Sequence, residues 1–239
     1  MACSTRTSRD AVLTAVTGAP GFVGQALARR MSRMDYPGRV MLIDRVAPDA
    51  LGGAFESVGA DVSSRAALKS ALEGADVVIR LAALPGGLSE ADPTASRQIN
   101  LEASLNLIDL LGSRSRPARL VYASSIAVLG PPFPTTIDDR TSAQPVTTYG
   151  AHKLMVEVAM ADAVRRGTIA GVALRLPGVV ARPSGAGGLK SAFLSNLFHA
   201  LADGRSIILP VVPEATVWLI SARTCADALN RWSITLRSH

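Results

Sequence analysis

The sequence predicts an α/β fold in which a parallel sheet is covered by helices on both faces. Short apolar runs alternate with helix-like patterns through most of the 239 residues, which is typical of parallel strands joined by helical crossovers. The first apolar run, Val12–Thr17, is followed at once by a glycine-rich turn and then by a helix-like run, Gln25–Met31. The length suits one large α/β domain or a domain with a small appendage.

The glycine-rich turn is a variant of a dinucleotide-binding motif. It reads Gly18-Ala19-Pro20-Gly21-Phe22-Val23-Gly24, or Gly-x-x-Gly-x-x-Gly. The first glycine permits a tight turn, the second lets the backbone approach a pyrophosphate, and the third lets the helix pack closely on the strand. The phosphates would meet free N–H groups at the positive end of the helix. Because a strand precedes the turn and a helix follows it, the motif predicts a Rossmann-type doubly wound parallel sheet.

Asp44 ends the second apolar run, Val40–Ile43. A carboxylate about twenty residues beyond the glycine turn can accept both ribose hydroxyls of a dinucleotide and would repel a 2′-phosphate. We therefore expect NAD rather than NADP as the cofactor, although Arg45 follows directly and could soften that preference. The alternative for Asp44 is an ordinary turn residue at a strand end.

The remaining elements follow from apolar periodicity and from proline and glycine punctuation. We expect strands at 55–58, 76–79, 119–123 and 172–176, helices at 64–72, 94–111 and 191–202, a helix that carries Tyr149, loops at 85–93 and 130–145, and a β-like stretch at 207–220. Residues 1–181 are expected to form the dinucleotide-binding domain, which also carries the catalytic candidates. Residues 182–239 are expected to form a short substrate-binding region.

Tyr149 and Lys153 are the leading catalytic candidates. Positions i and i+4 share one face of a helix, so the phenol and the ammonium can point into one cleft. A positive charge beside a phenol favours the phenolate and lowers the pKa of the tyrosine, which would make Tyr149 an acceptor for a substrate hydroxyl proton. The alternative is a chance pair on a solvated helix face.

Ser124 and Ser125 follow the strand at 119–123. The carboxyl ends of parallel strands are where doubly wound sheets bind ligands, so either hydroxyl can be expected to bond a substrate oxygen. Both serines also suit a turn or a helix cap.

Composition narrows the class of partner. The net charge of +6 comes mostly from arginines spread along the chain, which favours a solvated basic surface over a nucleic-acid site. There is no apolar run of membrane-spanning length, and the polar N-terminus lacks the apolar core of a signal peptide. Cys3 and Cys225 lie at opposite ends, which suits a reducing cytoplasm. No metal site is expected, because no Cys/His cluster has ligand spacing.

Taken together, these segments resemble the extended short-chain dehydrogenase/reductase superfamily, which also contains nucleotide-sugar epimerases. The resemblance rests on the glycine turn, Asp44, Asp61-Val62, Leu81-Ala82-Ala83, Asn100, Ser124-Ser125 and the Tyr149/Lys153 pair. Within the superfamily the chain is similar to D-erythronate dehydrogenases, through the segments 89–92, 124–130, 137–139, 174–180 and 218–223. Relatives continue beyond the position of Trp232, so the substrate-binding part is expected to be shorter here.

The resemblance implies a role for each matching position. Tyr149 would be the general base, Lys153 would lower its pKa and bond the nicotinamide ribose, and Ser125 would orient the reacting hydroxyl. The implied contacts with NAD are Gly18, Gly21, Phe22, Val23, Gly24, Asp44, Asp61, Val62, Leu81, Ala82, Ala83, Asn100, Tyr149, Lys153 and Pro177. The implied contacts with substrate are Ser124, Ser125, Tyr149, Ser191 and Arg223.

Arg223 is the expected partner of a substrate carboxylate, because a guanidinium can hold it with two hydrogen bonds. A solvated arginine at a helix start is the equal alternative. Superfamily members often pair through the helix that carries the tyrosine. Leu154, Val158 and Ala161 suit such a homodimer and equally suit packing on the sheet.

The expected function is NAD-dependent oxidation of a secondary hydroxyl of a small sugar acid, D-erythronate or a similar compound, to the 2-keto acid. Two alternatives remain: an epimerase or dehydratase acting on a nucleotide-linked sugar, and a dinucleotide-binding module without catalysis.

Overall fold

A six-stranded parallel sheet forms the centre of the molecule. The computed structural model describes residues 11–34, 36–49, 51–180, 182, 192–212 and 214–235. The strand order is β3-β2-β1-β4-β5-β6 and every neighbouring pair is parallel. The strands are β1 Leu13–Thr17, β2 Arg39–Asp44, β3 Phe55–Gly59, β4 Val77–Arg80, β5 Arg119–Ser125 and β6 Ala170–Leu176. This order confirms the predicted Rossmann-type doubly wound fold, with the reversal of strand order between β1 and β4.

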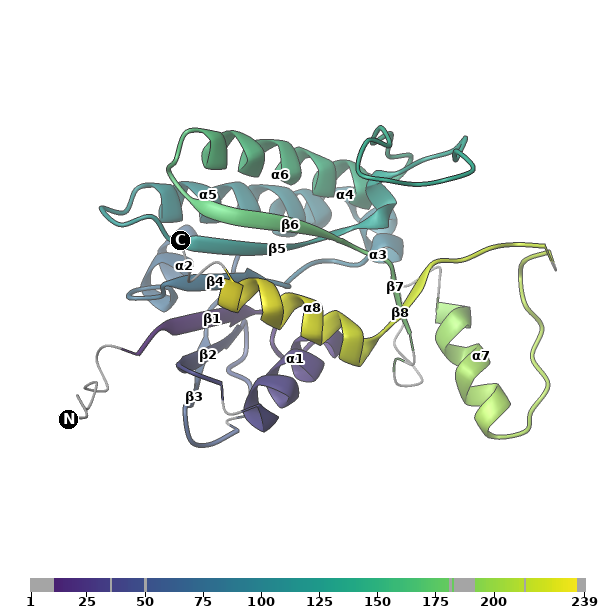
Figure 1. Ribbon diagram of the computed structural model, residues 1–239, viewed down its shortest axis with the longest axis horizontal. Coiled ribbons are helices and arrows are strands. Elements are labelled where there is room, and N and C mark those ends of the chain that lie inside the picture. Colours follow the sequence, from purple (N-terminus) through teal and green to yellow (C-terminus); the bar gives the residue numbers. More distant parts are fainter. Residues whose placement is uncertain are drawn as a thin grey trace, which may run out of the picture.

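Helices cover both faces of this sheet. One face carries α4, α5 and α6, and the opposite face carries α1 and α8 (Figure 1). Their bounds are α1 Phe22–Arg33, α2 Arg65–Ala71, α4 Pro93–Ser96, α5 Ala103–Gly112, α6 Thr148–Arg165 and α8 Ala222–Thr235. The helix α1 buries Gly24, Leu27, Ala28 and Met31, whose spacing places them on one helical face.

The region predicted as one helix from 94 to 111 is instead divided. Asp92 caps α4 by accepting a hydrogen bond from the Ala95 N–H at 2.9 Å, and Pro93 occupies the first helical position, where a missing N–H costs nothing. A π-helical segment, Arg97–Glu102, then precedes α5. The preceding segment, expected to be a loop, contains the short helix α3, Gly86–Ala91, which begins directly after Pro85.

A small second sheet lies beyond β6. The strands β7, Gly178–Val180, and β8, Leu219–Ser221, pair in parallel, and α7, Ala192–Ala202, stands beside them at the edge of the molecule (Figure 1). The β-like stretch expected at 207–220 was wrong over most of its length, because among its described residues only those from Leu219 onward form a strand. Ile208 is 94% exposed, so its apolar character reflects no pairing with another strand.

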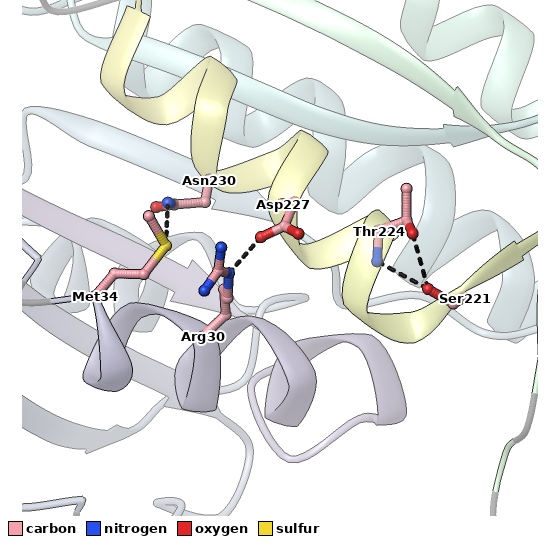
Figure 2. A network of polar contacts seen from close by, with 6 residues as sticks. All are labelled: Arg30, Met34, Ser221, Thr224, Asp227 and Asn230. Carbon is pink, nitrogen blue, oxygen red and sulfur yellow. Dashed lines mark hydrogen bonds and ion pairs between the residues drawn. The ribbon is translucent and has the colours of Figure 1, made fainter.

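Helix α8 returns the chain to the main sheet. Cys225, Ala226 and Leu229 join the core that contains Leu27 and Met31 of α1. Figure 2 shows the polar contacts along this seam, where Arg30 pairs with Asp227 and Asn230 Nδ2 lies 3.7 Å from Met34 Sδ. The sequence-based division at 181/182 therefore separates a helix from the sheet on which it packs.

The start of α8 is fixed by Ser221, whose Oγ accepts a hydrogen bond from the Thr224 N–H at 3.0 Å (Figure 2). This is the arrangement of an N-cap residue. No helix among the described residues is both long enough and apolar enough to cross a bilayer.

Candidate active site

A cleft of about 680 Å³ lies at the carboxyl ends of the central strands. The glycine turn forms one wall, the residues that follow β4, β5 and β6 form the floor, and the first turns of α6 form the other wall. The cleft thus lies where the strand order reverses, which is the expected ligand site of a doubly wound sheet. Twelve of the residues predicted as site residues line it: Gly18, Gly21, Phe22, Val23, Gly24, Leu81, Ala83, Ser124, Ser125, Tyr149, Lys153 and Pro177.

The glycine turn has the shape that a dinucleotide requires. Gly18 adopts φ +75°, and a Cβ atom at this position would lie 2.5 Å from the backbone nitrogen of Ala82. A Cβ at Gly24 would lie 2.7 Å from the Cα of Ala19. Helix α1 begins at Phe22 with no side-chain cap and no acid in its first turn. Its first N–H groups are therefore available for a pyrophosphate, and the residues present fit NAD.

Asp44, Asp61 and Val62 lie at the ends of β2 and β3, outside the lining of the cleft. Asp44 accepts a hydrogen bond from the Arg45 N–H at 2.7 Å. Asp61 accepts two hydrogen bonds from Ser63, which hold the pKa of its carboxyl below the usual range. Both hydrogen bonds from Ser63 end on Oδ1 of Asp61, so Asp44 and Asp61 each keep one carboxylate oxygen without a partner among the described hydrogen bonds.

Tyr149 and Lys153 both face the cleft from the first turns of α6. Thr147 caps this helix by accepting a hydrogen bond from the Gly150 N–H at 3.1 Å. The Lys153 ammonium donates a hydrogen bond to the Ala123 carbonyl at 2.7 Å. It lies 5.4 Å from the centre of the Tyr149 ring and 4.6 Å from that of Tyr122. The i, i+4 spacing thus places both functional groups at one site.

The expectation that the pKa of Tyr149 is lowered is wrong for this geometry. Burial raises the pKa of Tyr149 to about 12, and the positive charge of Arg182 opposes this effect. Burial, assisted by the nearby charge of Arg80, lowers the pKa of Lys153 to about 7, while Glu157 opposes that shift. Desolvation disfavours the charged form of each group. The spacing of the two residues could not predict these pKa shifts, because it does not show how completely the site excludes water.

Ser124 and Ser125 lie side by side in sequence but point to different partners. Ser124 is 3% exposed, and its hydroxyl donates to Glu157, which also forms a 2.8 Å ion pair with Arg175. Ser125 lines the cleft and accepts a hydrogen bond from the Ala127 N–H at 3.1 Å. Ser125 is therefore the serine whose hydroxyl proton has no partner among the described hydrogen bonds.

Asn100 supports the site from beneath. Its side chain is 1% exposed. The carbonyl oxygen accepts from the Leu84 N–H at 2.8 Å, and the amide donates to the Leu84 carbonyl and to the hydroxyls of Ser89 and Ser96. Asn100 thus fixes the segment after β4. Ala82 lies in the same segment, with its backbone against Gly18.

Three lining or supporting residues were not singled out from the sequence. Arg182 and Glu90 line the cleft, and Glu157 lies on α6 four residues beyond Lys153. Its i+4 and i+8 spacing from Lys153 and Tyr149 was the signal that could have identified Glu157. Arg223 is exposed at the start of α8, outside the lining, and Ser191 lies outside the described residues.

Comparison with known proteins identifies the family. A model described as "NAD dependent epimerase/dehydratase family" matches residues 14–228. The chain belongs to this family. Its membership confirms the predicted extended short-chain dehydrogenase/reductase superfamily and, with it, NAD as the cofactor.

Two curated relatives and one solved structure are similar to this chain over most of its length. D-erythronate dehydrogenase of Cupriavidus necator is 33% identical over 225 residues, or 90% of this chain and 69% of the relative. D-erythronate dehydrogenase of Haemophilus influenzae is 30% identical over 93% of this chain and 74% of the relative. The crystal structure of a nucleoside-diphosphate-sugar epimerase from Agrobacterium tumefaciens superposes with a TM-score of 0.87 at 30% identity, covering 98% of this chain and 72% of that chain.

Proposed function

We propose that this protein is a dehydrogenase that oxidises a secondary hydroxyl of a small sugar acid, D-erythronate or a close analogue, to the 2-keto acid. The observation that supports it most directly is the convergence of Tyr149, Lys153 and Ser125 in one cleft with the glycine turn. The similarity to two D-erythronate dehydrogenases favours this substrate class over others.

In the proposed mechanism the protein orients the substrate and moves one proton. Ser125 donates a hydrogen bond to the reacting oxygen, and the phenolate of Tyr149 accepts the hydroxyl proton. The positive charge of Arg182 stabilises that phenolate within the buried site. Bound NAD supplies the hydride acceptor. The carbon–hydrogen and oxygen–hydrogen bonds of the alcohol are both broken, and a carbonyl results.

The test is NADH formation, followed by absorbance, with a panel of four-carbon hydroxy acids. Tyr149→Phe should lower the rate by at least about a thousandfold, because it removes the proton acceptor, while NAD binding measured by calorimetry persists. Tyr36→Phe is the matched control, since Tyr36 is a second buried phenol outside the lining of the cleft. Wild-type turnover that survives in Tyr149→Phe would remove Tyr149 from the mechanism.

A second candidate is epimerisation of a nucleotide-linked sugar, which the structural similarity to a nucleoside-diphosphate-sugar epimerase favours. The same proton acceptor would serve, but the hydride would return to the substrate. Conversion of such a sugar without net accumulation of NADH, together with no turnover of any hydroxy acid, would select this alternative.

A further inference from the structure

The cleft contains three charged side chains among its described lining: Glu90, Lys153 and Arg182. Two of them are committed to the backbone. Glu90 accepts a hydrogen bond from the Thr148 N–H at 2.7 Å, and Lys153 donates to Ala123. Among the described residues, the side chain of Arg182 donates one hydrogen bond, from Nε to the Val179 carbonyl at 3.3 Å. No carboxylate of the described residues pairs with it.

Two hydrogen bonds to helix α7 hold the backbone of Arg182 in place. Its N–H donates to Ser195 Oγ at 3.2 Å, and its carbonyl accepts from His199 Nε2 at 2.6 Å. These two partners lie four residues apart on α7, so they share one helical face. The guanidinium lies over the Phe22 ring, 5.1 Å from its centre. An arginine held in this way loses little freedom on binding an anion.

Arg182 also lies close enough to Tyr149 for each charge to affect the other group. Burial raises the pKa of Tyr149 and the charge of Arg182 opposes that rise, while burial lowers the pKa of Arg182 and Tyr149 opposes that fall. In a 2-hydroxy acid the carboxyl carbon is bonded directly to the carbon that bears the reacting hydroxyl. The proton acceptor and the carboxylate partner must therefore face the same cleft, as Tyr149 and Arg182 do.

We propose that Arg182 binds the carboxylate of the substrate through its two terminal amino groups and so selects 2-hydroxy acids over neutral polyols. The proposal rests on the proposed function, since it assigns the recognition element of that same site. It replaces Arg223, which is exposed at the start of α8 and does not line the cleft.

The cofactor pyrophosphate is the other anion near this position, because Phe22 begins the helix α1 whose N–H groups face the cleft. Both anions suit a guanidinium. Proximity to Tyr149 favours the carboxylate, and the two sources give different results when substrate and cofactor are varied separately.

The experiment compares D-erythronate with its neutral amide in wild type, Arg182→Gln, Arg182→Lys and the exposed control Arg205→Gln. Loss of a partner for a desolvated charge should lower the acid-to-amide ratio of kcat/KM by about a hundredfold in Arg182→Gln. Arg182→Lys should restore part of that ratio, because it keeps the charge but not the planar fork. Arg205→Gln should retain the wild-type ratio. In Arg182→Gln the dissociation constant for NAD should change by less than about threefold.

Equal losses on acid and amide would overturn the proposal, because they would show an effect on Tyr149 or on folding rather than on the carboxylate. Weaker NAD binding with an unchanged acid-to-amide ratio would assign Arg182 to the pyrophosphate instead. If wild type oxidises no hydroxy acid at all, the proposed function fails. Calorimetric binding of D-erythronate to the NAD-loaded protein, compared between wild type and Arg182→Gln, then tests Arg182 separately.

Discussion

The ammonium of Lys153 donates its hydrogen bond to the carbonyl of Ala123 at 2.7 Å, so one buried side chain ties helix α6 to the end of strand β5. Lys153 is only 2% exposed. Burial and the charge of Arg80 lower its pKa from the ordinary value of 10.5 to about 7. A charged group that lines the cleft beside Tyr149 therefore changes charge close to neutral pH.

The stability of the fold should rise with pH because of Lys153. Between pH 7 and 9 the unfolded chain keeps this lysine protonated while the folded chain releases the proton, so the free energy of unfolding increases across that window. Lys153→Met should remove this increase in the free energy of unfolding, as measured by thermal unfolding at pH 7 and at pH 9. Lys69→Met, at an exposed position of α2, is the control and should preserve it. Equal slopes in wild type and Lys153→Met would contradict the assignment.

The oxidation rate should rise with pH. Since the pKa of Tyr149 is raised to about 12, the phenolate fraction grows about tenfold for each pH unit below that value. A plot of log kcat/KM against pH from 7 to 10 measures this slope. Ser125→Ala should lower the whole profile by about tenfold, the effect of one neutral hydrogen bond, and leave the slope unchanged. A profile that is flat above pH 7 would exclude a phenol with a raised pKa as the base.

Replacing Gly18 with alanine should damage both folding and NAD binding. The residue has φ +75°, and an added Cβ would collide with the backbone of Ala82 at 2.5 Å. Gly74→Ala is the matched control, since Gly74 has φ +74° and nothing lies within 4 Å of its added Cβ. We expect about 1–2 kcal/mol of destabilisation at Gly74 from the backbone conformation alone. A further loss of about 1–3 kcal/mol is expected at Gly18 from overpacking, measured by urea unfolding. Equal losses would mean that Ala82 moves aside.

Glu157→Gln should cost more stability than a comparable change at the surface. Glu157 accepts from Ser124 and pairs with Arg175 at 2.8 Å, and its side chain is 11% exposed. Removing its charge should cost about 1–3 kcal/mol, because Arg175 loses a charged partner. The control is Glu56→Gln. The side chains of Glu56 and Arg39 are 45% and 43% exposed, so their ion pair should contribute less than about 1 kcal/mol. The comparison fails if both variants unfold at the same urea concentration.

The parts of this fold that could be predicted from sequence are those set by local patterns. The turn at Gly18–Gly24, the strand that ends at Asp44 and the helix that carries Tyr149 each follow from neighbouring residues, and all were placed within a few positions. The β-like stretch expected at 207–220, which prolines interrupt, was wrong over most of its length because a strand requires a partner. In the described part of the chain only Leu219–Ser221 pairs with Gly178–Val180, and no local pattern reveals which part of an apolar stretch will do so.

The site shows the same division. Tyr149 and Lys153 were predicted to share a cleft because helical spacing fixes their direction. The sequence could not show whether Arg182 or Arg223 faces the cleft, since each follows a short apolar strand-like run. Arg182 faces the cleft because Ser195 and His199 hold its backbone, and Arg223 faces solvent because α8 begins immediately before it. Both outcomes depend on long-range packing.

The backbone of Arg182 is hydrogen-bonded to α7 rather than to the six-stranded sheet. The proposed binding of the substrate carboxylate and the binding of the cofactor at the glycine turn therefore depend on different parts of the chain. An engineer could therefore redesign α7 and its flanks to accept a different acid while leaving the glycine turn untouched. The same division offers evolution a simple route from one hydroxy acid to another.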